Sequence, residues 1–478
     1  MDFSSTQGVR VQKLDWQLST TEVFGCFAHL PRAILLDSAG SDHCDAKYDI
    51  ISFDPLATIT SQEGVTQTRH LRPAGDNQTP ATDYPQETSS KTDPFSILQA
   101  AIAAYFPVQH RCELPFSGGA LGTFSYDLGR RIEKLPATAA KDISLPEMNV
   151  GLYDWALLFC YQSQTWSLVH YHGEAALKSR LADIESRLGA HRQGDKAVNK
   201  ATFSLSRDWQ AQITKDEYRD KFDRVQEYLH SGDCYQINLT QRFEAEYRGD
   251  EWQAYLKLRA SNKAPFSAFI RLEQHAILSI SPERFIKLNG DAIETKPIKG
   301  TMARASDIEA DKAAAAMLAA SEKDRAENLM IVDLLRNDIG KVASPGSVRV
   351  PHLFAIESFP AVHHLVSTVT ATLAAPNTPC DLLRAAFPGG SITGAPKIRA
   401  MEIIEELEPS RRSLYCGSIG YISQDRQMDT SITIRTLVAE PPHLYCWAGG
   451  GIVADSRVDA EYQESYDKVS KILPILSN

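Results

Sequence analysis

One lysine lies in a segment whose neighbouring proline and glycine favour a tight turn. In "ETKPIKGTMAR" (294–304), Lys299 follows an isoleucine and precedes a glycine, with Pro297 and Thr301 close by. A lysine amine is a nucleophile only when it is neutral, so a reactive role requires a dry or cation-rich pocket. The alternative is an exposed turn lysine, which is the commoner situation for this residue type.

A carboxyl group is expected near this lysine. Glu283, in "SPERF", lies within the predicted strand "AILSISPERFIKL", which an Asn289–Gly290 turn joins to the segment leading to Lys299. We therefore expect Glu283 and Lys299 on partner strands of one hairpin, with both side chains facing one cavity.

Acidic residues on two predicted helices form a second candidate centre. Glu327 lies beside the apolar face of "ENLMIVDLLRND", and Glu461 and Glu464 lie three residues apart in "DAEYQESYDK". One carboxylate from each helix, together with water and an anionic substrate, is a typical way to hold Mg²⁺. Solvated acidic flanks explain the same pattern, and both interpretations stay open.

A glycine- and hydroxyl-rich segment, "FPGGSITGAPK" (387–397), precedes another predicted helix. Ser391 and Thr393 alternate with glycines, and Pro396 is expected at the first helical position. Free backbone N–H groups and the positive helix end would together form an anion seat. An ordinary helix start explains the segment equally well, and the spacing is not that of a P-loop.

A second place for a carboxylate is expected further on. Arg435 is predicted in the middle of a strand, "SITIRTLVAE", and the glycines of "AGGGIV" (448–453) are predicted to form a turn. A buried arginine there would need an anionic partner, whereas a surface arginine would not.

Composition limits the classes of protein that fit. The chain has 478 residues, 43% hydrophobic and 23% charged, which is typical of a globular protein with a large core. The net charge of −10 argues against a nucleic-acid or anionic-membrane surface, yet allows a local basic pocket. Eight single cysteines without a CxxC pair favour a reducing compartment, and the amino terminus shows no apolar signal segment. We expect a cytoplasmic protein.

The elements that position these residues mix strands and helices without a βαβ rhythm, which predicts an α+β fold. A capping box at Thr214–Glu217 should open a helix that Gly232 ends. Residues 307–338 are expected to be helical. The polar segment 189–210 predicts a boundary between two regions, 1–195 and 205–474. Strands are expected at 33–38, 48–55, 156–162 and along "CYQINLTQRF", "FSAFIRL" and "AILSISPERFIKL", and a closing helix from about 459.

Several long motifs, in order from about 214 to 473, resemble the chorismate-utilising enzymes: "PIKGT", "ENLMIVDLLRNDIG", "FPGGSITGAPK", "CGSIGY", "IRT", "AGGGIVADS" and "EYQES". The resemblance implies a single large fold of mostly antiparallel sheets packed together with helices outside. Region 205–474 would be the chorismate-binding catalytic part. Region 1–195 would resemble anthranilate synthase component I, because "ILLDS" is similar to the amino-acid effector motif of glutamine-dependent members.

Two positions sort the chemistry within this family. Members that add water carry a lysine where this chain has Gln236, and anthranilate-forming members have "PIAGT" where this chain has Lys299. The resemblance therefore implies the branch that makes 4-amino-4-deoxychorismate, the precursor of 4-aminobenzoate and folate. Lys299 would attack C2 of chorismate while the C4 hydroxyl leaves with Glu283 as general acid. Ammonia would then add at C4 and expel the lysine.

The same resemblance implies the remaining site residues. Mg²⁺ would be held by Glu327 and Glu464, with Glu461 nearby. Chorismate would be bound by His364, Ser391, Thr393, Gly394, Lys397, Tyr415, Arg435, Gly449 and Gly451. A tryptophan-sized effector pocket would be formed by Ser38, Asp45, Ala46, Lys47, Tyr48, Pro265 and Phe266. Here "LLDS" departs from the "LLES" of feedback-inhibited members, which leaves regulation by tryptophan open.

The chain shows no nucleophilic-cysteine elbow with a downstream His–Glu pair, so ammonia is expected from a separate glutaminase subunit in a heterodimer. Three alternatives remain. The first is an anthranilate-forming enzyme. The second is a non-catalytic tryptophan-binding sensor, against which the joint presence of Glu283, Lys299, Glu327 and Glu464 argues. The third is a pyridoxal phosphate enzyme, although no phosphate cup adjoins Lys299 in the sequence.

Overall fold

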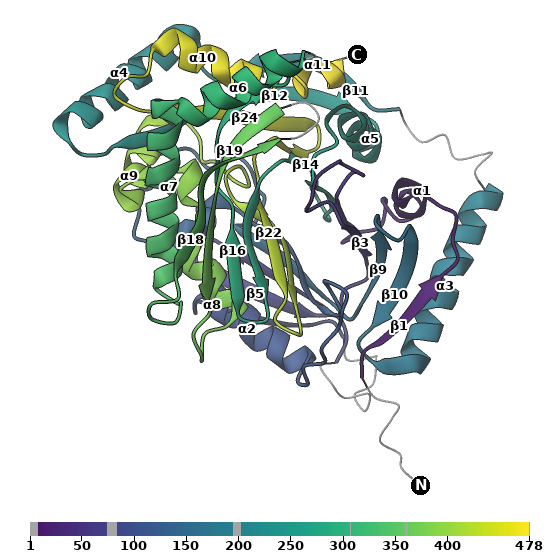
Figure 1. Cartoon of the computed structure of the whole chain (residues 1–478). Helices are drawn as coiled ribbons and strands as arrows, with labels where there is room; N and C mark the ends of the chain where they lie inside the picture. Colours follow the sequence, from purple (N-terminus) through teal and green to yellow (C-terminus); the bar gives the residue numbers. More distant parts are fainter. Residues whose placement is uncertain (1–7, 74–83, 195–201, 306, 359–361, 478) are drawn as a thin grey trace.

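The computed structural model describes residues 8–73, 84–194, 202–305, 307–358 and 362–477. Two large sheets form its centre, and helices lie around their outer sides (Figure 1). All pairings between neighbouring strands of these sheets are antiparallel. The predicted α+β class, with antiparallel sheets and external helices, is confirmed.

The first sheet runs in the spatial order β1 (Arg10–Leu14), β10 (Thr165–His170), β9 (Trp155–Cys160), β3 (Tyr48–Ser52), β2 (Ile34–Asp37), β13 (Phe266–Arg271), β14 (Ala276–Ser281), β23 (Thr436–Glu440), β24 (His443–Ile452), β12 (Gln236–Arg248) and β11 (Ser204–Ala211), with the short β20 (Gly394–Ala395) also paired to β12. The second sheet runs in the order β17 (Ile298–Ala303), β19 (Val362–Thr372), β16 (Ala292–Thr295), β15 (Arg284–Asn289), β22 (Met428–Ile432), β21 (Ser418–Ser423), β7 (Gly119–Phe124), β8 (Met148–Tyr153), β4 (Ala57–Gln62), β5 (Val65–His70) and β6 (Gln86–Ser90), with β18 (Arg349–Ser358) paired to β19.

Helices cover these sheets. They are α1 (Thr20–Gly25), α2 (Pro94–Tyr105), α3 (Gly173–Gly194), α4 (Lys215–Ser231), α5 (Glu251–Asn262), α6 (Ile308–Ala320), α7 (Glu322–Gly340), α8 (Pro379–Ala386), α9 (Lys397–Leu407), α10 (Val458–Asp467) and α11 (Leu473–Ser477), together with the 3₁₀ turns η2 (Tyr126–Arg131) and η3 (Gly390–Ile392). In the described part of the chain, none of them combines the length and apolar character needed to cross a membrane.

The main core lies between the two sheets. Ile270 of β13 and Ile277 of β14 belong to one buried cluster with Ile286 and Leu288 of β15. Side chains alternate along each strand, so Leu278 of β14 points to the opposite face and packs in a second cluster under α1, α3 and α5. A third cluster seats α4 and α9 on β12. Burial on both faces explains why several strands read as nearly continuous apolar runs.

Local signals in the sequence agree with the structure at several places. Thr214 and Glu217 form the expected capping box, and Gly232 ends α4 in a left-handed conformation. The predicted helix over 307–338 is wrong in one respect, because it is two helices that meet at Ser321. Ser321 ends α6, and its side chain accepts a hydrogen bond from Asp324 N–H at the start of α7.

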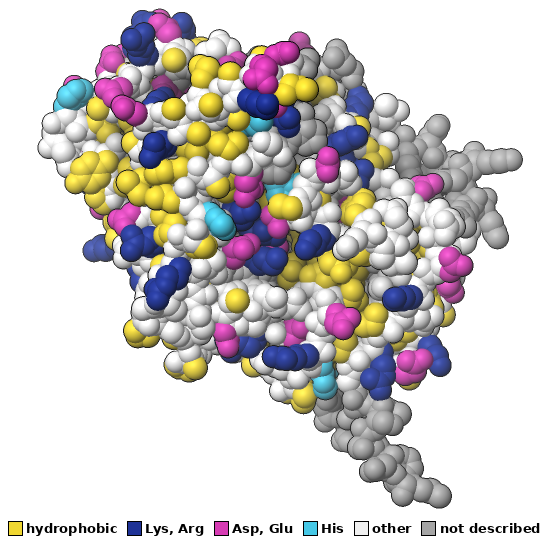
Figure 2. Space-filling view, in the orientation of Figure 1, with side chains coloured by type: hydrophobic (Ala, Val, Ile, Leu, Met, Phe, Trp, Pro, Cys, Tyr) yellow, Lys and Arg dark blue, Asp and Glu magenta, His cyan; other side chains and the backbone are white. Residues whose placement is uncertain are grey.

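Both predicted regions contribute to both sheets. Strand β2 pairs with β13 in the first sheet, and β7 pairs with β21 in the second. The division into 1–195 and 205–474 therefore stays a prediction about the sequence, and part of its boundary falls outside the described residues. On the face drawn in Figure 2, acidic and basic side chains are interspersed, so the net negative charge does not form a single acidic patch there.

Candidate active site

Lys299 and Glu283 meet, although not as the hairpin prediction expected. The Asn289–Gly290 turn does join β15 to β16, but that hairpin ends at Thr295. Lys299 lies beyond it on β17, which pairs with β19. Glu283 precedes β15. The prediction of partner strands is wrong because Pro297 interrupts the ladder and the chain moves to the sheet edge.

Ser391 of η3 connects the two side chains. The Lys299 ammonium donates to the Ser391 carbonyl at 3.3 Å. The Ser391 hydroxyl donates to Oε1 of Glu283, also at 3.3 Å. Gly390 allows this approach, because a Cβ at that position would overlap the side chain of Leu334 on α7. One serine thus brings an amine and a carboxyl group into one site.

The surroundings of Glu283 raise its pKa above the usual value of a glutamate. Burial raises the pKa of Glu283, and the nearby charges of Lys299, Lys468 and Arg435 oppose this rise without cancelling it. A raised pKa is the direction that suits a carboxyl group acting as a general acid.

Arg435 is not in the middle of a strand, and that prediction is wrong. It lies between β22 and β23 with a φ of 51°, where the chain passes from the second sheet to the first. Its carbonyl accepts from Ile280 N–H at 3.0 Å. Its side chain is exposed to solvent, and among the described residues its guanidinium has no hydrogen bond or ion pair. The protein atoms around it still exclude part of its water, which lowers the pKa of Arg435, while the charge of Glu283 opposes this shift. An arginine in this state can bind an incoming carboxylate.

The glycines of "AGGGIV" form part of strand β24 and not the predicted turn. They are needed because other groups approach closely: a Cβ at Gly449 would overlap the Leu239 carbonyl of β12. A Cβ at Gly450 would lie 3.1 Å from Oε2 of Glu461 and 3.1 Å from Oε1 of Glu464. The glycines therefore leave room for two carboxylates of α10.

These carboxylates have properties that fit a cation. Glu461 is 3% exposed, and its Oε1 accepts from the Ser456 hydroxyl at 2.7 Å. Its Oε2 is buried without a hydrogen-bond partner among the described residues. Burial raises the pKa of Glu461, and the charge of Glu464 adds to this effect. Burying a carboxylate oxygen without a partner destabilises the folded state, and a bound cation would remove that cost.

Glu327 lies on α7 across from α10. Burial raises the pKa of Glu327, the charges of Lys299 and Lys323 oppose this rise, and the charge of Glu461 adds a smaller contribution to it. The three predicted metal ligands do not all converge within 4.8 Å. Among the described residues the group that does so is His43, Cys44 and Asp45, which lies elsewhere.

His364 lies on β19 opposite Thr301 of β17, and its Nδ1 is 2.8 Å from the Thr301 hydroxyl oxygen. Burial, assisted by the charge of Arg435, lowers the pKa of His364 to about 4. The imidazole is therefore neutral near pH 7. It is close enough to Arg435 for the arginine's charge to act on it.

Lys397 and Thr393 are engaged within the protein. The Lys397 ammonium pairs with the carboxylate of Asp338 and donates to the Ala386 carbonyl at 3.0 Å. The Thr393 hydroxyl donates to backbone carbonyls of its own turn at 3.2 and 3.3 Å. Pro396 is the N-cap of α9 and not its first residue, which corrects the prediction by one position.

The other predicted substrate residues lie on the β12–β24 side of the site or next to it. Tyr415 is buried and stacks on Trp447 with ring centroids 5.9 Å apart. A Cβ at Gly394 would overlap the Gln236 carbonyl, and one at Gly451 would overlap the Gln236 amide nitrogen. The Gln236 side chain is fully buried, and neither of its amide atoms has a partner among the described residues.

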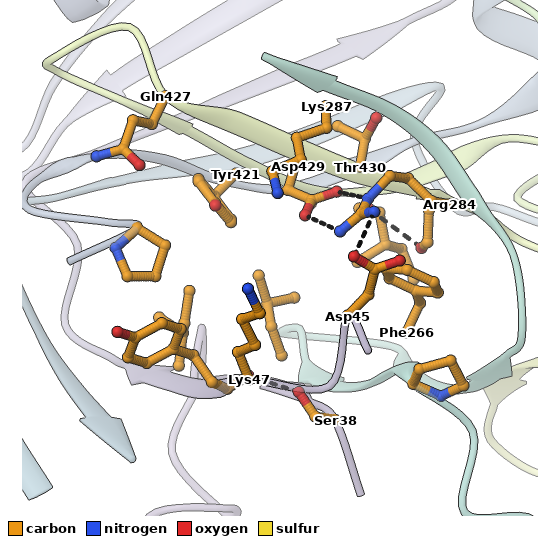
Figure 3. A pocket seen from close by; sticks show the side chains of 18 of the residues that line it. Ser38, Asp45, Lys47, Phe266, Arg284, Lys287, Tyr421, Gln427, Asp429 and Thr430 are labelled. Carbon is orange, nitrogen blue, oxygen red and sulfur yellow. Dashed lines mark hydrogen bonds and ion pairs between the residues drawn. The ribbon is translucent and has the colours of Figure 1, made fainter. Parts of the chain in front are cut away.

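A separate cavity of about 230 Å³ lies between the two sheets, and we call it the inter-sheet pocket (Figure 3). Its lining includes six of the seven residues predicted for the effector site: Ser38, Asp45, Lys47, Tyr48, Pro265 and Phe266. Ala46 is buried but does not line the cavity, because successive residues of the segment point in different directions.

The opposite wall of the inter-sheet pocket was missed by the sequence analysis. It comes from β15 and β22 and includes Arg284, Lys287, Asp429 and Thr430. Arg284 is 4% exposed and pairs with Asp429 and Asp45 (Figure 3). The signal that could have found it is a charged residue in the otherwise apolar start of "RFIKL", next to Glu283. The sequence analysis also missed Lys468. Its Nζ lies 2.7 Å from Oε1 of Glu464, and the spacing of four residues near the end of one helix could have indicated this pair.

Comparison with known proteins identifies the family of the chain. The family model for chorismate binding enzymes matches residues 32–474, and the chain therefore belongs to that family. It is 53% identical over 467 residues to aminodeoxychorismate synthase component 1 of Salmonella typhimurium, covering 97% of this chain and 98% of that protein. It is also 37% identical over 386 residues to anthranilate synthase component 1 of Thermus thermophilus, covering 80% and 82%. The crystal structure of anthranilate synthase component I from Streptococcus pneumoniae superimposes with a TM-score of 0.75 at 30% identity, covering 90% and 93% of the two chains.

Proposed function

We propose that this chain aminates chorismate at C4 and releases 4-amino-4-deoxychorismate, with Lys299 as covalent nucleophile and ammonia as nitrogen source. The single observation that supports this most is the Lys299–Ser391–Glu283 arrangement, which provides an amine and a carboxyl group of raised pKa in one site. The 53% identical Salmonella protein carries the name of this activity.

The reaction proceeds by two displacements. The neutral amine of Lys299 forms a bond to C2, the two conjugated ring double bonds shift towards C4, and the C4–oxygen bond breaks. Glu283 gives its proton to the departing hydroxyl, which leaves as water, and its carboxylate then takes the proton that the new C2–ammonium group releases. Ammonia next bonds to C4, the two double bonds shift back, and the C2–nitrogen bond to Lys299 breaks. Glu283 returns its proton to the departing lysine nitrogen and takes one from the new C4–ammonium group. The lysine amine is restored at the end of the cycle.

Glu327, Glu464 and Glu461 would hold Mg²⁺, because they provide hard oxygen ligands and one of these oxygens lacks a partner. When bound, the ion supplies positive charge that neutralises the ring carboxylate of chorismate. Gly450 contributes by leaving space beside Glu461 and Glu464.

Arg435 would bind the enolpyruvyl carboxylate, since its guanidinium has no partner among the described residues and a carboxylate can engage it through two parallel hydrogen bonds. Tyr415, Gly449 and Gly451 would complete this side. His364 would lie near the leaving hydroxyl as a neutral imidazole, for which its lowered pKa is suited.

The inter-sheet pocket would take tryptophan. Phe266 and Tyr48 offer aromatic surface, while Ser38 and Lys47 offer polar groups for the amino-acid end. Saturating tryptophan that leaves chorismate kinetics unchanged would fit a structural role for this ligand, and strong inhibition would overturn that role. A separate glutaminase subunit would deliver ammonia, in line with the "component 1" names of the relatives. The reaction would take place in the cytoplasm and feed 4-aminobenzoate and folate synthesis.

Mass spectrometry tests the proposal directly. The protein is incubated with chorismate and Mg²⁺ without ammonia and then digested. The peptide bearing Lys299 should gain the mass of chorismate minus water, and the gain should vanish in Lys299→Ala. An unmodified peptide after this incubation, from a preparation that is active when ammonia is supplied, would contradict the covalent step. Residual turnover in Lys299→Ala would not, because ammonia could add directly.

The second candidate is anthranilate synthesis, which the 37% identical Thermus thermophilus relative favours. Chorismate, Mg²⁺ and ammonia would then yield a fluorescent product and pyruvate, whereas 4-amino-4-deoxychorismate formation releases no pyruvate. Tryptophan binding without turnover under any ammonia supply would instead indicate a sensor.

A further inference from the structure

Arg284 connects the inter-sheet pocket to the active site. It directly follows Glu283 in the chain, yet its side chain lines the inter-sheet pocket while the Glu283 carboxyl faces Ser391. Consecutive residues at the start of a strand point to opposite faces, which explains how one short segment serves two sites.

The Arg284 guanidinium is clamped from several sides. Its Nε and Nη2 donate to the two carboxylate oxygens of Asp429, each at 2.9 Å. Its Nη1 lies 2.9 Å from Oδ1 of Asp45, and the group stacks over the Phe266 ring at 5.0 Å. Figure 3 shows these contacts converging on one side of the pocket. The side chain is 4% exposed, so the ion pairs are poorly screened by water.

The ion pairs of Arg284 lie next to the backbone contacts that hold Glu283. Arg284 pairs with Ser431 of β22, and Ile432 N–H donates to the Glu283 carbonyl at 3.0 Å. The β15–β22 register is irregular immediately after Arg284. The Ser281 hydroxyl also holds this segment, because it donates to the Ile432 carbonyl at 2.6 Å and accepts from Glu283 N–H at 3.3 Å. The ladder is disturbed on that side, so these backbone contacts and the Arg284 ion pairs together fix the start of β15.

We infer that Arg284 is a positioning residue for the reaction. Its ion pairs with Asp429 and Asp45 hold the start of β15, and thereby hold the Glu283 carboxyl at the distance from Lys299 that Ser391 bridges. The inference rests on the proposed function, because it takes Glu283 as the general acid. Since Asp45 belongs to the inter-sheet pocket, that pocket and the general acid share one support.

The test compares three ion-pair variants in the full chain with ammonia as nitrogen source. Arg284→Lys keeps the charge but cannot form the two-pronged contact with Asp429. Asp45→Asn removes one ion pair and leaves Arg284 intact. Arg242→Lys is the matched control, because Arg242 is 6% exposed, binds both oxygens of Asp142 at 2.8 and 2.7 Å, and stacks over an aromatic ring at 4.9 Å.

We expect Arg284→Lys to lower kcat about 10- to 100-fold, as small misplacements of reacting groups do, and to leave KM for chorismate nearly unchanged. The pH profile of kcat should shift as well, because the acid has moved. Asp45→Asn should also lower kcat without changing KM for chorismate, but by a smaller factor, about threefold to tenfold. Arg242→Lys should retain wild-type kcat and pH profile.

Glu283→Gln is measured in parallel to separate this inference from the proposed function. An inactive Glu283→Gln beside a fully active Arg284→Lys overturns the positioning role alone. An active Glu283→Gln overturns both. An equal drop in kcat in Arg284→Lys and Arg242→Lys would show that any buried ion pair has this effect through general destabilisation, and would overturn the inference. Thermal unfolding reports whether each variant folds, and if Arg284→Lys does not, Asp45→Asn decides.

Discussion

The hydroxyl of Thr301 lies 2.8 Å from Nδ1 of His364, across the β17–β19 pair. Thr301 is two residues after Lys299 in the chain. Burial lowers the pKa of His364 to about 4, so the ring that faces Thr301 is neutral near pH 7. A neutral imidazole carries one N–H, and its partners determine which nitrogen that is and how the ring is turned.

Thr301→Val should therefore lower activity by releasing the His364 ring. Loss of one hydrogen bond worth about 1 kcal/mol corresponds to about a fivefold drop in kcat/KM for chorismate. Steady-state amination assays measure this effect. Thr301→Ser keeps the hydroxyl and should keep most of the activity. Equal rates in the valine and serine variants would show that the hydrogen bond has no part in the reaction.

The sequence predicted elements best where their signals are local. The capping box of Thr214 and the left-handed Gly232 depend on contacts within four residues, and both were correct. Arg435 was misplaced because its conformation depends on Ile280, whose N–H it accepts across the first sheet. The three glycines of β24 look like a turn in composition, yet the approach of β12 requires them.

The active site was predicted in a similar, partial way. Motif resemblance pointed to Lys299, Glu283 and Ser391, which the structure brings together, and to one wall of the inter-sheet pocket. It could not show that Lys397 is held by Asp338, because that pair joins segments 59 residues apart. Nor could it reveal the role of Arg284, which depends on the packing of two sheets. Pairings between distant segments are fixed by packing rather than by local pattern.

Neighbouring glycines of β24 should respond differently to substitution by alanine. Gly449→Ala would overlap the Leu239 backbone, so we expect a loss of about 1–3 kcal/mol in unfolding free energy. Gly450→Ala would only crowd Glu461 and Glu464 at 3.1 Å, so stability should change little while the Mg²⁺ concentration for half-maximal activity rises several-fold. Urea unfolding and Mg²⁺ titration of activity distinguish the two. Similar Mg²⁺ requirements in Gly450→Ala and wild type would remove this glycine from the metal site.

Lys397 should matter more for stability than for chorismate binding. Its ammonium neutralises Asp338, which is 1% exposed. Of the residues that the structure describes, Lys341, at 3.0 Å, is the cation that stays paired with Asp338 when Lys397 is replaced. Lys397→Met should lower the unfolding free energy by about 2 kcal/mol, because a buried carboxylate loses one of its two cations. The KM for chorismate should stay within about twofold, since an ammonium already held by Asp338 adds little to substrate binding. A large rise in KM without loss of stability would instead place Lys397 against the substrate.

The pH dependence of stability should carry the signature of Asp49. This carboxyl is fully buried, and burial together with the charge of Asp37 raises the pKa of Asp49 to about 7, although Thr20, Tyr161 and Ser38 donate hydrogen bonds to it. Between about pH 4 and pH 7 the folded protein keeps a proton at Asp49 that the unfolded chain has released. The folded state binds more protons in this window, so the contribution of Asp49 to stability falls as pH rises and stays low above pH 7.

Asp49→Asn should therefore gain stability relative to wild type as pH rises. The difference in unfolding free energy between the two proteins should grow by on the order of 2–4 kcal/mol from pH 4.5 to pH 8, because each pKa unit is worth 1.36 kcal/mol. Urea denaturation at several pH values measures it, with Asp216→Asn as the exposed control, since Asp216 is 90% exposed. A difference between Asp49→Asn and wild type that stays constant across this range would mean that Asp49 is ionised in the folded protein. The Asp37–Asp49 pair would then have to be balanced by Arg259, whose guanidinium lies 2.6 Å from Oδ2 of Asp37.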